Sequence, residues 1–214
     1  MYKGFKIIAL IPAKGNSTRL PNKNIKLLLG KPLVAWSIES ALESKYIDNV
    51  VVSTDSEAIK EIALKYDGVK VLNRPKELCL PTSHIKETLK HTVENVETDF
   101  VLLMNPTSPC RFNIDIFIEQ FDPINYDTAA SVEECKVYPW GSTTEANMQS
   151  LKPFAYDTGS LYLHKANYIL DNMYWCPDVN RRQPIVTPEW MNREIDTDVD
   201  WVIVEALMEK YKNK

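Results

Sequence analysis

The chain has 214 residues, a formal net charge of −4 at pH 7 and a sequence pI of about 5.5. This length suits one α/β core, so we expect residues 1–214 to form a single domain. An acidic chain without a stripe of lysine and arginine lacks the electrostatic footprint of a nucleic-acid-binding protein. No apolar run reaches membrane-spanning length and no signal peptide precedes the first strand, which predicts a cytoplasmic protein with no membrane partner.

The cysteines and histidines are too scattered to indicate a metal or redox site. No Cys-x-x-Cys pair occurs among Cys79, Cys110, Cys135 and Cys176. We therefore expect reduced cysteines, and chemistry that does not depend on histidine.

The strongest functional signal is the loop after the first apolar run. Residues 7–11 have the length of a buried strand, and Pro12 then opens a segment of small and basic residues. Small residues let backbone N–H groups approach a ligand, and the cations supply positive charge. Such a loop suits a polyphosphate, and a solvated surface loop is the alternative interpretation. The residues concerned are Ala13, Lys14, Gly15, Asn16, Ser17, Arg19, Lys23 and Asn24.

Apolar periodicity predicts a β-α-β-α order along the first half of the chain, and therefore parallel strands joined by right-handed crossovers. An irregular stretch at 133–153 then precedes a further strand and a terminal helix. The expected strands are 7–11, 50–55, 69–72, 100–104 and 160–163, and the expected helices are 32–42, 56–66, 84–96 and 201–211.

Polar residues follow three of these strands. They are the opening loop, residues 53–55 and residues 105–111. Ligands of open parallel sheets bind at the carboxyl ends of the strands, so these segments are expected to share one crevice. Thr107 and Ser108 are also suited to cap a helix.

The run Ile-Pro-Ala-Lys-Gly-Asn-Ser-Thr-Arg-Leu-Pro-Asn-Lys-Asn at 11–24 closely resembles the signature loop of the CMP-sialic acid synthetases (acylneuraminate cytidylyltransferases). It is neither a Walker A loop nor a Gly-x-Gly-x-x-Gly fingerprint. The resemblance implies an α/β, Rossmann-like three-layer nucleotidyltransferase fold with a mostly parallel sheet. It also implies CTP and a sugar acid as substrates, and a homodimer. Further similar blocks lie at 52–55, 74–78, 102–111, 158–162 and 194–201.

The resemblance implies roles for individual residues. Lys14, Arg19, Lys23 and Asp196 would be catalytic, and about residues 135–160 would form the lip of the acceptor site and a dimerisation excursion. The residues implied to bind CTP are Ala13, Gly15, Asn16, Ser17, Asn24, Arg74, Thr82 and Ser83. Those implied to bind the sugar are Asn105, Tyr162, Tyr174 and Trp175.

The acidic cluster at 194–200 is the candidate Mg²⁺ site. Mg²⁺ prefers one or two carboxylates together with substrate phosphate oxygens and water. Alternate residues of an extended chain point the same way, so Glu194 and Asp196 can share a face. We assign Asp196, and secondarily Glu194, to Mg²⁺, and Asp198 or Asp200 to the cap of the terminal helix.

The chain departs from the family pattern on the acceptor side. Tyr156 and Asp157 stand where the family has Arg-Pro, and Asn105 stands where it usually has glutamine. The arginines expected to hold a sialic acid carboxylate are therefore not visible, and we expect N-acetylneuraminate to be a poor substrate and a related sugar acid a better one. The remaining candidate cations are Lys136, Lys152, Arg181 and Arg182.

Two other functions remain open. One is a nucleotidyltransferase of the same fold that uses another sugar or nucleotide. The other is an inactive homologue that only binds nucleotide. The presence of both the loop cations and Asp196 argues against the inactive homologue.

Overall fold

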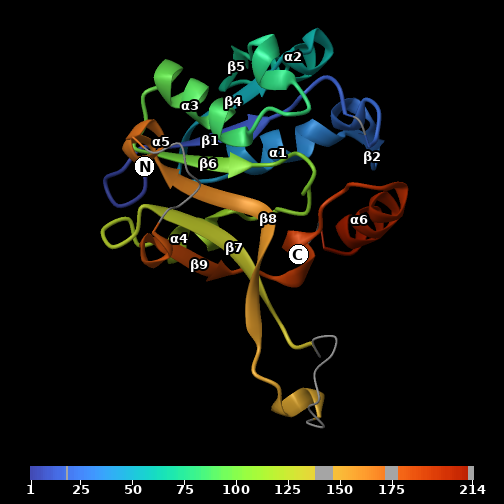
Figure 1. The fold of residues 1–214 in the computed structure, drawn as a ribbon. Helices are drawn as coiled ribbons and strands as arrows, with labels where there is room; N and C mark the ends of the chain where they lie inside the picture. The colour runs from blue at the N-terminus through green and yellow to red at the C-terminus, as the bar shows by residue number, and fades with distance from the viewer. Residues whose placement is uncertain (18, 138–146, 172–177, 212–214) are drawn as a thin grey trace.

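A seven-stranded sheet forms the centre of the computed structural model, in the order β5-β4-β1-β6-β8-β7-β9 (Figure 1). The structure describes residues 1–17, 19–137, 147–171 and 178–211. The strands of this sheet are β1 (Ile7–Pro12), β4 (Ile47–Thr54), β5 (Val69–Asn73), β6 (Phe100–Met104), β7 (Thr128–Cys135), β8 (Phe154–Lys165) and β9 (Arg182–Val186). A separate two-stranded antiparallel sheet is formed by β2 (Leu27–Leu28) and β3 (Lys31–Pro32).

The sheet is mostly parallel. β5, β4, β1 and β6 run in one direction, while β8 is antiparallel to both β6 and β7. β9 pairs with β7 in parallel. In the register, Leu10 of β1 lies between Val51 of β4 and Leu103 of β6. The predicted α/β fold with a mostly parallel sheet is therefore confirmed.

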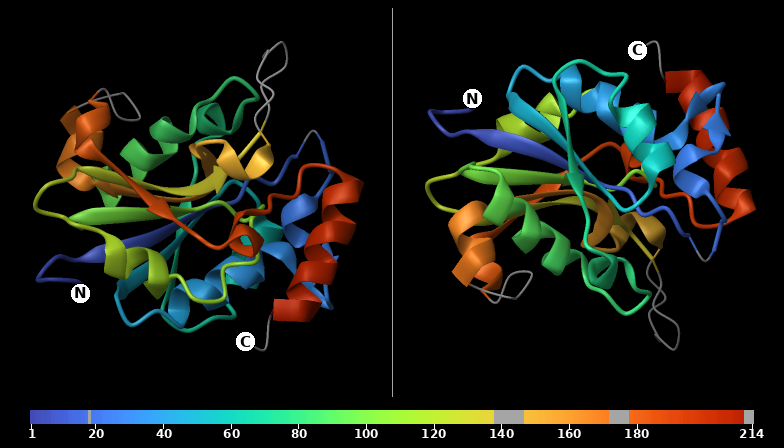
Figure 2. Two further views of the ribbon diagram at one scale, coloured as in Figure 1. Left: turned by 90° about the horizontal axis from the view of Figure 1, so that it is seen from below. Right: turned by 90° about the horizontal axis from the view of Figure 1, so that it is seen from above.

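Helices cover both faces of the sheet (Figure 2). The core on one face is built with α1, α2 and α4, and the core on the other with α3 and α5. The α-helices are α1 (Leu33–Leu42), α2 (Glu57–Ala63), α3 (Ile85–Asn95), α4 (Asp115–Gln120), α5 (Ala166–Asp171) and α6 (Asp198–Tyr211). The 3₁₀ helices are η1 (Lys23–Ile25), η2 (Lys76–Cys79), η3 (Met148–Ser150), η4 (Val179–Arg181) and η5 (Glu189–Asn192).

Burial on both faces explains the unbroken apolar run of β1. Ile7, Ala9 and Ile11 enter one core, and Ile8 and Leu10 enter the other. A strand covered by helices on both sides has no polar face, which is typical of parallel sheets.

A third apolar cluster lies beside the sheet and packs α6 against the rest of the protein. Trp201, Val204 and Met208 of α6 pack with Leu28 of β2 and Leu33 of α1. This packing brings the C-terminal part of the chain next to the segment that follows β1. Within the described residues, no helix has the length and apolar character required to span a membrane.

The ends of β7 and β8 form a two-stranded arm that projects from the body (Figure 1). Cys135 pairs with Phe154 and Glu133 with Tyr156. The sequence predicts an irregular stretch at 133–153 and a strand that begins only at residue 160. β8 instead begins at Phe154, and the sequence conceals this because residues 154–157 are exposed and show no apolar alternation.

Candidate active site

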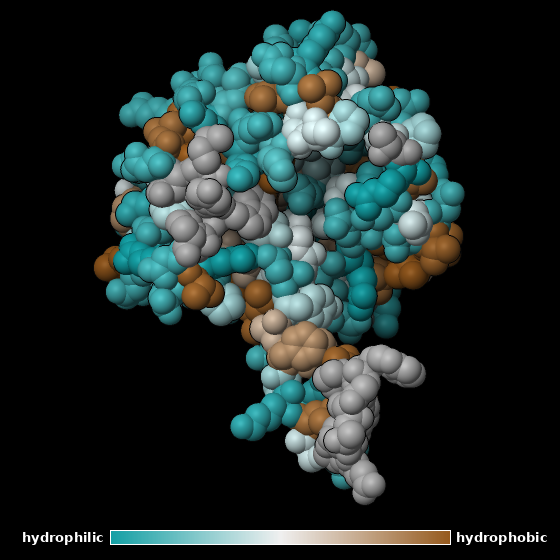
Figure 3. Space-filling model, in the orientation of Figure 1, coloured by the Kyte–Doolittle hydropathy of each residue, from teal (hydrophilic) through white to brown (hydrophobic). Residues whose placement is uncertain are grey.

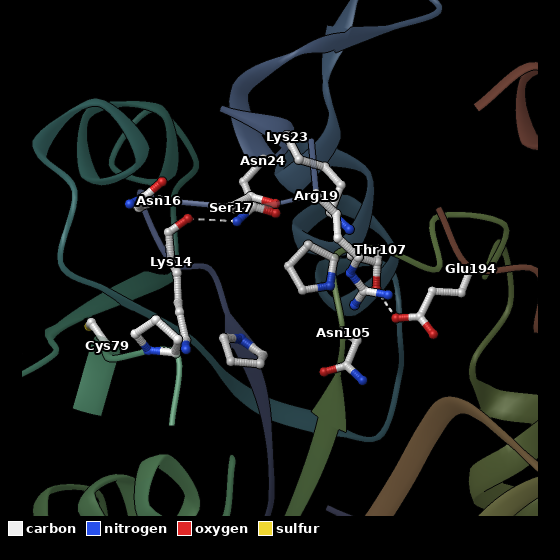
Figure 4. Close-up of a pocket in the computed structure, with 13 residues that line it drawn as sticks. Lys14, Asn16, Ser17, Arg19, Lys23, Asn24, Cys79, Asn105, Thr107 and Glu194 are labelled. Atoms are coloured by element: carbon white, nitrogen blue, oxygen red, sulfur yellow. Dashed lines mark hydrogen bonds between the residues drawn. The ribbon is translucent and has the colours of Figure 1, made fainter. Parts of the chain in front are cut away.

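A cavity of about 390 Å³ opens beyond the carboxyl ends of β1 and β6 (Figure 4). This position agrees with the rule that ligands of open α/β sheets bind at the ends of the strands. The structure brings many residues proposed from the sequence to its wall. These are Lys14, Asn16, Ser17, Arg19, Lys23, Asn24, Asn105 and Glu194.

Two hydrogen bonds fix the opening loop. Asn24 Nδ2 donates to Lys14 O over 2.9 Å, and Gly15 N donates to Asp55 Oδ1 over 2.8 Å. A Cβ on Gly15 would lie 2.8 Å from Cβ of Ser56, which is closer than real Cβ atoms approach. Glycine is therefore required here because the loop packs against the segment after β4. Ala13 is buried and continues the pairing, since its N–H donates to Ser53 O over 2.9 Å.

Two of the three loop cations share a carboxylate partner, and the third contacts a backbone carbonyl. Lys14 Nζ donates to Leu80 O over 3.1 Å. Arg19 and Lys23 both reach Asp196, with Arg19 Nη1 2.5 Å from Oδ2 and Lys23 Nζ 3.3 Å from Oδ1. The Lys23 side chain is only 7% exposed, while that of Arg19 is 66% exposed. Asp196 is thus contacted by two cations of the cavity wall, the buried Lys23 and the long, exposed side chain of Arg19.

The predicted capping role within the acidic cluster is confirmed for Asp200, while the assignment of Asp196 and Glu194 to Mg²⁺ stays a prediction. Glu194 lines the cavity and accepts a 2.7 Å hydrogen bond from Thr107 Oγ1 (Figure 4). Asp200 instead forms a capping box with Thr197. Its Oδ2 accepts from Thr197 N over 2.7 Å, and Thr197 Oγ1 accepts from Asp200 N over 3.2 Å. The hydrogen bonds from Thr197 lower the pKa of Asp200.

Glu194 and Asp196 are the carboxylates that could hold a metal ion. Among the residues described by the structure, no three His, Cys, Asp or Glu side chains gather into a metal-binding group. Mg²⁺ does not need such a group, because one or two carboxylates suffice when phosphate oxygens and water complete its shell. Glu194 lies on the cavity wall and Asp196 contacts two cations of that wall, so the donor set fits Mg²⁺ shared with a phosphate ligand.

Five residues assigned to CTP do not lie on the cavity wall, namely Ala13, Gly15, Arg74, Thr82 and Ser83. Arg74 is buried and donates to Ser53, from Nε to Oγ over 3.1 Å and from Nη2 to the carbonyl over 2.7 Å. Burial lowers its pKa. Thr82 and Ser83 follow η2, where Ser83 Oγ donates to Glu77 O over 2.6 Å. In this structure Arg74 supports the end of β4, so any contact with a nucleotide stays a prediction.

The proposed acceptor residues are only partly described. Asn105 lines the cavity and its Nδ2 donates to Gly159 O over 3.0 Å. Tyr162 is buried in β8, away from the wall, and its hydroxyl donates to Asp157 Oδ1 over 2.7 Å. Tyr174 and Trp175 lie outside the described residues.

Arg111 is a supporting residue that the sequence reading missed. It is 1% exposed, and its guanidinium donates to the carbonyls of Ser160 and Asn105, each over 2.6 Å, and to Ser37 Oγ over 2.8 Å. Burial lowers its pKa to about 9. Arg111 therefore ties the end of β6 to β8 and α1. Residues 102–111 had been noted as one block, but spacing alone does not distinguish a buried arginine from one that faces a ligand.

Cys79 and Pro81 also line the cavity, although neither is assigned a binding role from the sequence. Both belong to the segment after β5, a strand that runs parallel to β4. The signal that could have found them is that the end of this third strand meets the same edge of the sheet.

Comparison with known proteins gives a consistent result. A family model described as cytidylyltransferase matches residues 8–135. The CMP-N,N'-diacetyllegionaminic acid synthase of Legionella pneumophila is 31% identical over 226 residues, which cover 95% of this chain and 97% of that protein. N-acylneuraminate cytidylyltransferase A of Danio rerio is 29% identical over 95% of this chain and 51% of its own length. The chain thus spans about half of that second relative.

Solved structures share the fold. The CMP:2-keto-3-deoxy-manno-octonic acid synthetase complexed with CTP matches with a TM-score of 0.71 at 16% identity, over 96% of this chain and 99% of that one. A 4-diphosphocytidyl-2C-methyl-D-erythritol synthase matches with a TM-score of 0.66 at 16% identity, over 95% of this chain and 99% of that one. At these identities the likeness concerns the fold alone.

Proposed function

The chain belongs to the cytidylyltransferase family, and from this premise we propose that it transfers the CMP part of CTP to a sugar acid and releases pyrophosphate. The observation that carries the proposal is the cavity whose wall bears the three loop cations and Glu194, with Asp196 in contact with Arg19 and Lys23. Similarity to a CMP-N,N'-diacetyllegionaminic acid synthase over nearly the full length of both chains supports a sugar acid as the acceptor.

In the proposed reaction, a hydroxyl oxygen of the sugar attacks the α-phosphorus of CTP, and the bond from that phosphorus to the bridging oxygen of pyrophosphate breaks. Negative charge accumulates on the phosphates, so catalysis requires positioning and electrostatic stabilisation. Lys14, Arg19 and Lys23 would supply fixed positive charge. Lys23 is suited to this role because its burial and its 2.6 Å hydrogen bond to Ile195 O hold Nζ in one place.

Asp196 and Glu194 would hold Mg²⁺, which when bound neutralises phosphate charge. Asp196 now accepts from Arg19 and Lys23. When triphosphate arrives, its oxygens can take over these two cations and leave the carboxylate available to the metal ion. Glu194 keeps its orientation through Thr107.

We further propose a homodimer that uses the arm of β7 and β8. Val137, Met148 and Phe154 on the arm are 44–50% exposed, and Figure 3 shows apolar surface along it. Exposed apolar residues on a projecting element commonly mark a protein–protein contact. We place the reaction in the cytoplasm, consistent with the unpaired state of Cys79, Cys110 and Cys135.

The test is pyrophosphate release with a panel of CTP, UTP, ATP and GTP, each combined with N,N'-diacetyllegionaminic acid, N-acetylneuraminic acid and a neutral hexose. We expect release only with CTP and a sugar acid, in the presence of Mg²⁺. Release with another nucleotide or with the neutral sugar would favour the alternative nucleotidyltransferase. Binding of CTP without turnover of any sugar would identify an inactive homologue.

A further inference from the structure

Behind the part of the cavity wall that carries Asn105 and Glu194 lies a polar cluster, which we define as Asp157, Tyr162 and Arg182. Gly159 contacts both the cavity wall and this cluster. Glu194 Oε2 lies 3.6 Å from the position that a Cβ of Gly159 would take, and Asn105 Nδ2 donates to Gly159 O over 3.0 Å. On its other side, Gly159 N donates to Asp157 Oδ1 over 3.0 Å. The polar cluster is therefore next to the wall that carries Asn105 and Glu194.

Asp157 orients the other two members of the cluster. Its Oδ1 accepts from the Tyr162 hydroxyl over 2.7 Å, and its Oδ2 accepts from Arg182 Nη2. The guanidinium carbon of Arg182 lies 5.9 Å from the centroid of the Tyr162 ring. Asp157 thus holds Arg182 by one nitrogen, against an aromatic ring.

Arg182 has hydrogen-bonding capacity left for a ligand. A guanidinium carries five N–H donors, and only Nη2 has an acceptor among the described residues. The side chain is 28% exposed, so it is accessible to a ligand without being free in solvent. A planar fork of this kind matches the two oxygens of a carboxylate.

The neighbouring cations are engaged elsewhere. Arg181 binds both oxygens of Asp127, at 2.7 Å from Nε and 2.8 Å from Nη2. Lys165 lies 3.7 Å from the same carboxylate, and Lys136 donates to Gln149 O on the arm. Arg182 differs from these because its anionic partner, Asp157, accepts from Gly159 N, and Gly159 O in turn accepts from Asn105 of the cavity wall.

We infer that Arg182 binds the carboxylate of the acceptor sugar acid and that Asp157 is the positioning residue that orients it. This inference rests on the proposed function and assigns the recognition of the acid to a residue that no sequence motif marks. The anionic acceptor would approach a cation already fixed in direction, which reduces the ordering cost of binding. It also explains how a chain with Tyr156 and Asp157 in place of Arg-Pro can use a sugar acid.

The test compares Arg182→Gln with its neighbour Arg181→Gln as the matched control. Each is assayed for pyrophosphate release with CTP and the better of N,N'-diacetyllegionaminic acid and N-acetylneuraminic acid, and with the methyl ester of the same acid. We expect Arg182→Gln to lower kcat/KM for the acid about 10- to 100-fold, mainly through KM, because a charge-assisted bidentate contact is lost. The KM for CTP and the kcat/KM for the ester should change less than about twofold.

A structural role would give a different pattern. If Arg182→Gln reduces acid and ester equally, or leaves the acid unaffected, the inference is overturned. Arg182→Lys keeps the charge without the fork, so it should fall between wild type and Arg182→Gln. Asp157→Asn should raise the KM for the acid and leave that for CTP unchanged. An inactive wild type with every sugar acid would overturn the proposed function itself, whereas an active wild type with a normal Arg182→Gln variant would overturn only this inference.

Discussion

Lys23 and Asp196 are 173 positions apart in the sequence, yet Lys23 Nζ lies 3.3 Å from Asp196 Oδ1. Lys23 also donates to the carbonyl of Ile195. The site is therefore assembled from the loop after β1 and the segment before α6. Because Asp196 already neutralises part of the loop charge, the cations stay ordered before an anionic ligand binds.

Lys23→Ala is expected to lower kcat about 10²- to 10³-fold. A fixed cation that faces developing phosphate charge in a site with little water contributes as much as one oxyanion-hole donor. The measurement is steady-state pyrophosphate release at saturating CTP and sugar acid. Turnover close to wild type would remove Lys23 from the mechanism.

Lys26→Ala is the matched control for that variant. Lys26 also follows the opening loop, but its side chain is 45% exposed and lies 3.6 Å from Asp198 and over the ring of Trp201. We expect its kcat to stay within about twofold of wild type, because an exposed ion pair contributes little. A large loss of kcat here would mean that net charge, and not position, governs activity.

Asp196→Asn is expected to lower kcat at least about 100-fold and to raise the Mg²⁺ concentration needed for half-maximal activity. The change keeps the size of the side chain and removes its charge. The affinity for CTP should not weaken, since Arg19 and Lys23 lose a competing anion. Titration of activity with Mg²⁺ and thermal unfolding are the two measurements, with the exposed Asp198→Asn as the control.

Unfolding separates two roles of Asp196. If the melting temperature falls as steeply as activity, Asp196 stabilises the fold through its two ion pairs and is not a metal ligand. The pair with the exposed Arg19 contributes at most about 1 kcal/mol, whereas the buried Lys23 loses a charged partner and keeps its hydrogen bond to Ile195 O, so a moderate fall in melting temperature is expected.

The parts of the fold that were predictable are those with strong local patterns. β1 and β6 are unbroken apolar runs, and their ends carry the residues that line the cavity. β9 was missed because it is an edge strand with Pro184 in it and only Ile185 buried. α4 was missed because a helix of six residues is too short to show a helical period.

The sequence predicts which residue types form the site, but not how their side chains are oriented. Lys23 and Asp196 were both proposed, yet no pattern indicates that they contact each other. Arg74 and Arg111 show the limit most clearly, because both are arginines in recognisable blocks and both are buried as supports. Whether an arginine faces a ligand or a carbonyl is decided by long-range packing, which sequence spacing does not encode.

Asp200→Ala is expected to destabilise the protein by about 0.5–2 kcal/mol, the usual cost of losing a helix cap. The variant loses the reciprocal hydrogen bonds with Thr197 that begin α6. kcat should be unchanged at temperatures where the protein is folded. Thermal unfolding with a parallel activity assay checks this, and a fall in kcat without a fall in melting temperature would assign Asp200 to the reaction.

The contribution of Asp200 should depend on pH. Hydrogen bonds from Thr197 lower its pKa in the folded protein relative to the unfolded chain. Its stabilisation is therefore fully present above the unfolded pKa of about 3.9 and is lost as pH falls through the folded value. The difference in melting temperature between wild type and Asp200→Ala should therefore be constant between about pH 6 and pH 8. It should shrink below about pH 4, where Asp200 becomes protonated.

The last prediction concerns assembly through the arm. Phe154 is 50% exposed where β8 begins, opposite Cys135 of β7, on a part of the ribbon that extends beyond the body of the sheet. A two-stranded ribbon is marginally stable alone, so a second copy that covers its apolar side chains would stabilise it. We expect wild type to be a dimer by light scattering at micromolar concentration and Phe154→Asp to shift it toward monomer, because a charge would be buried unpaired. Ile124→Asp, at a site 79% exposed and remote from the arm, should leave the dimer intact. A monomeric wild type, or equal effects of the two substitutions, would show that the arm is not the contact.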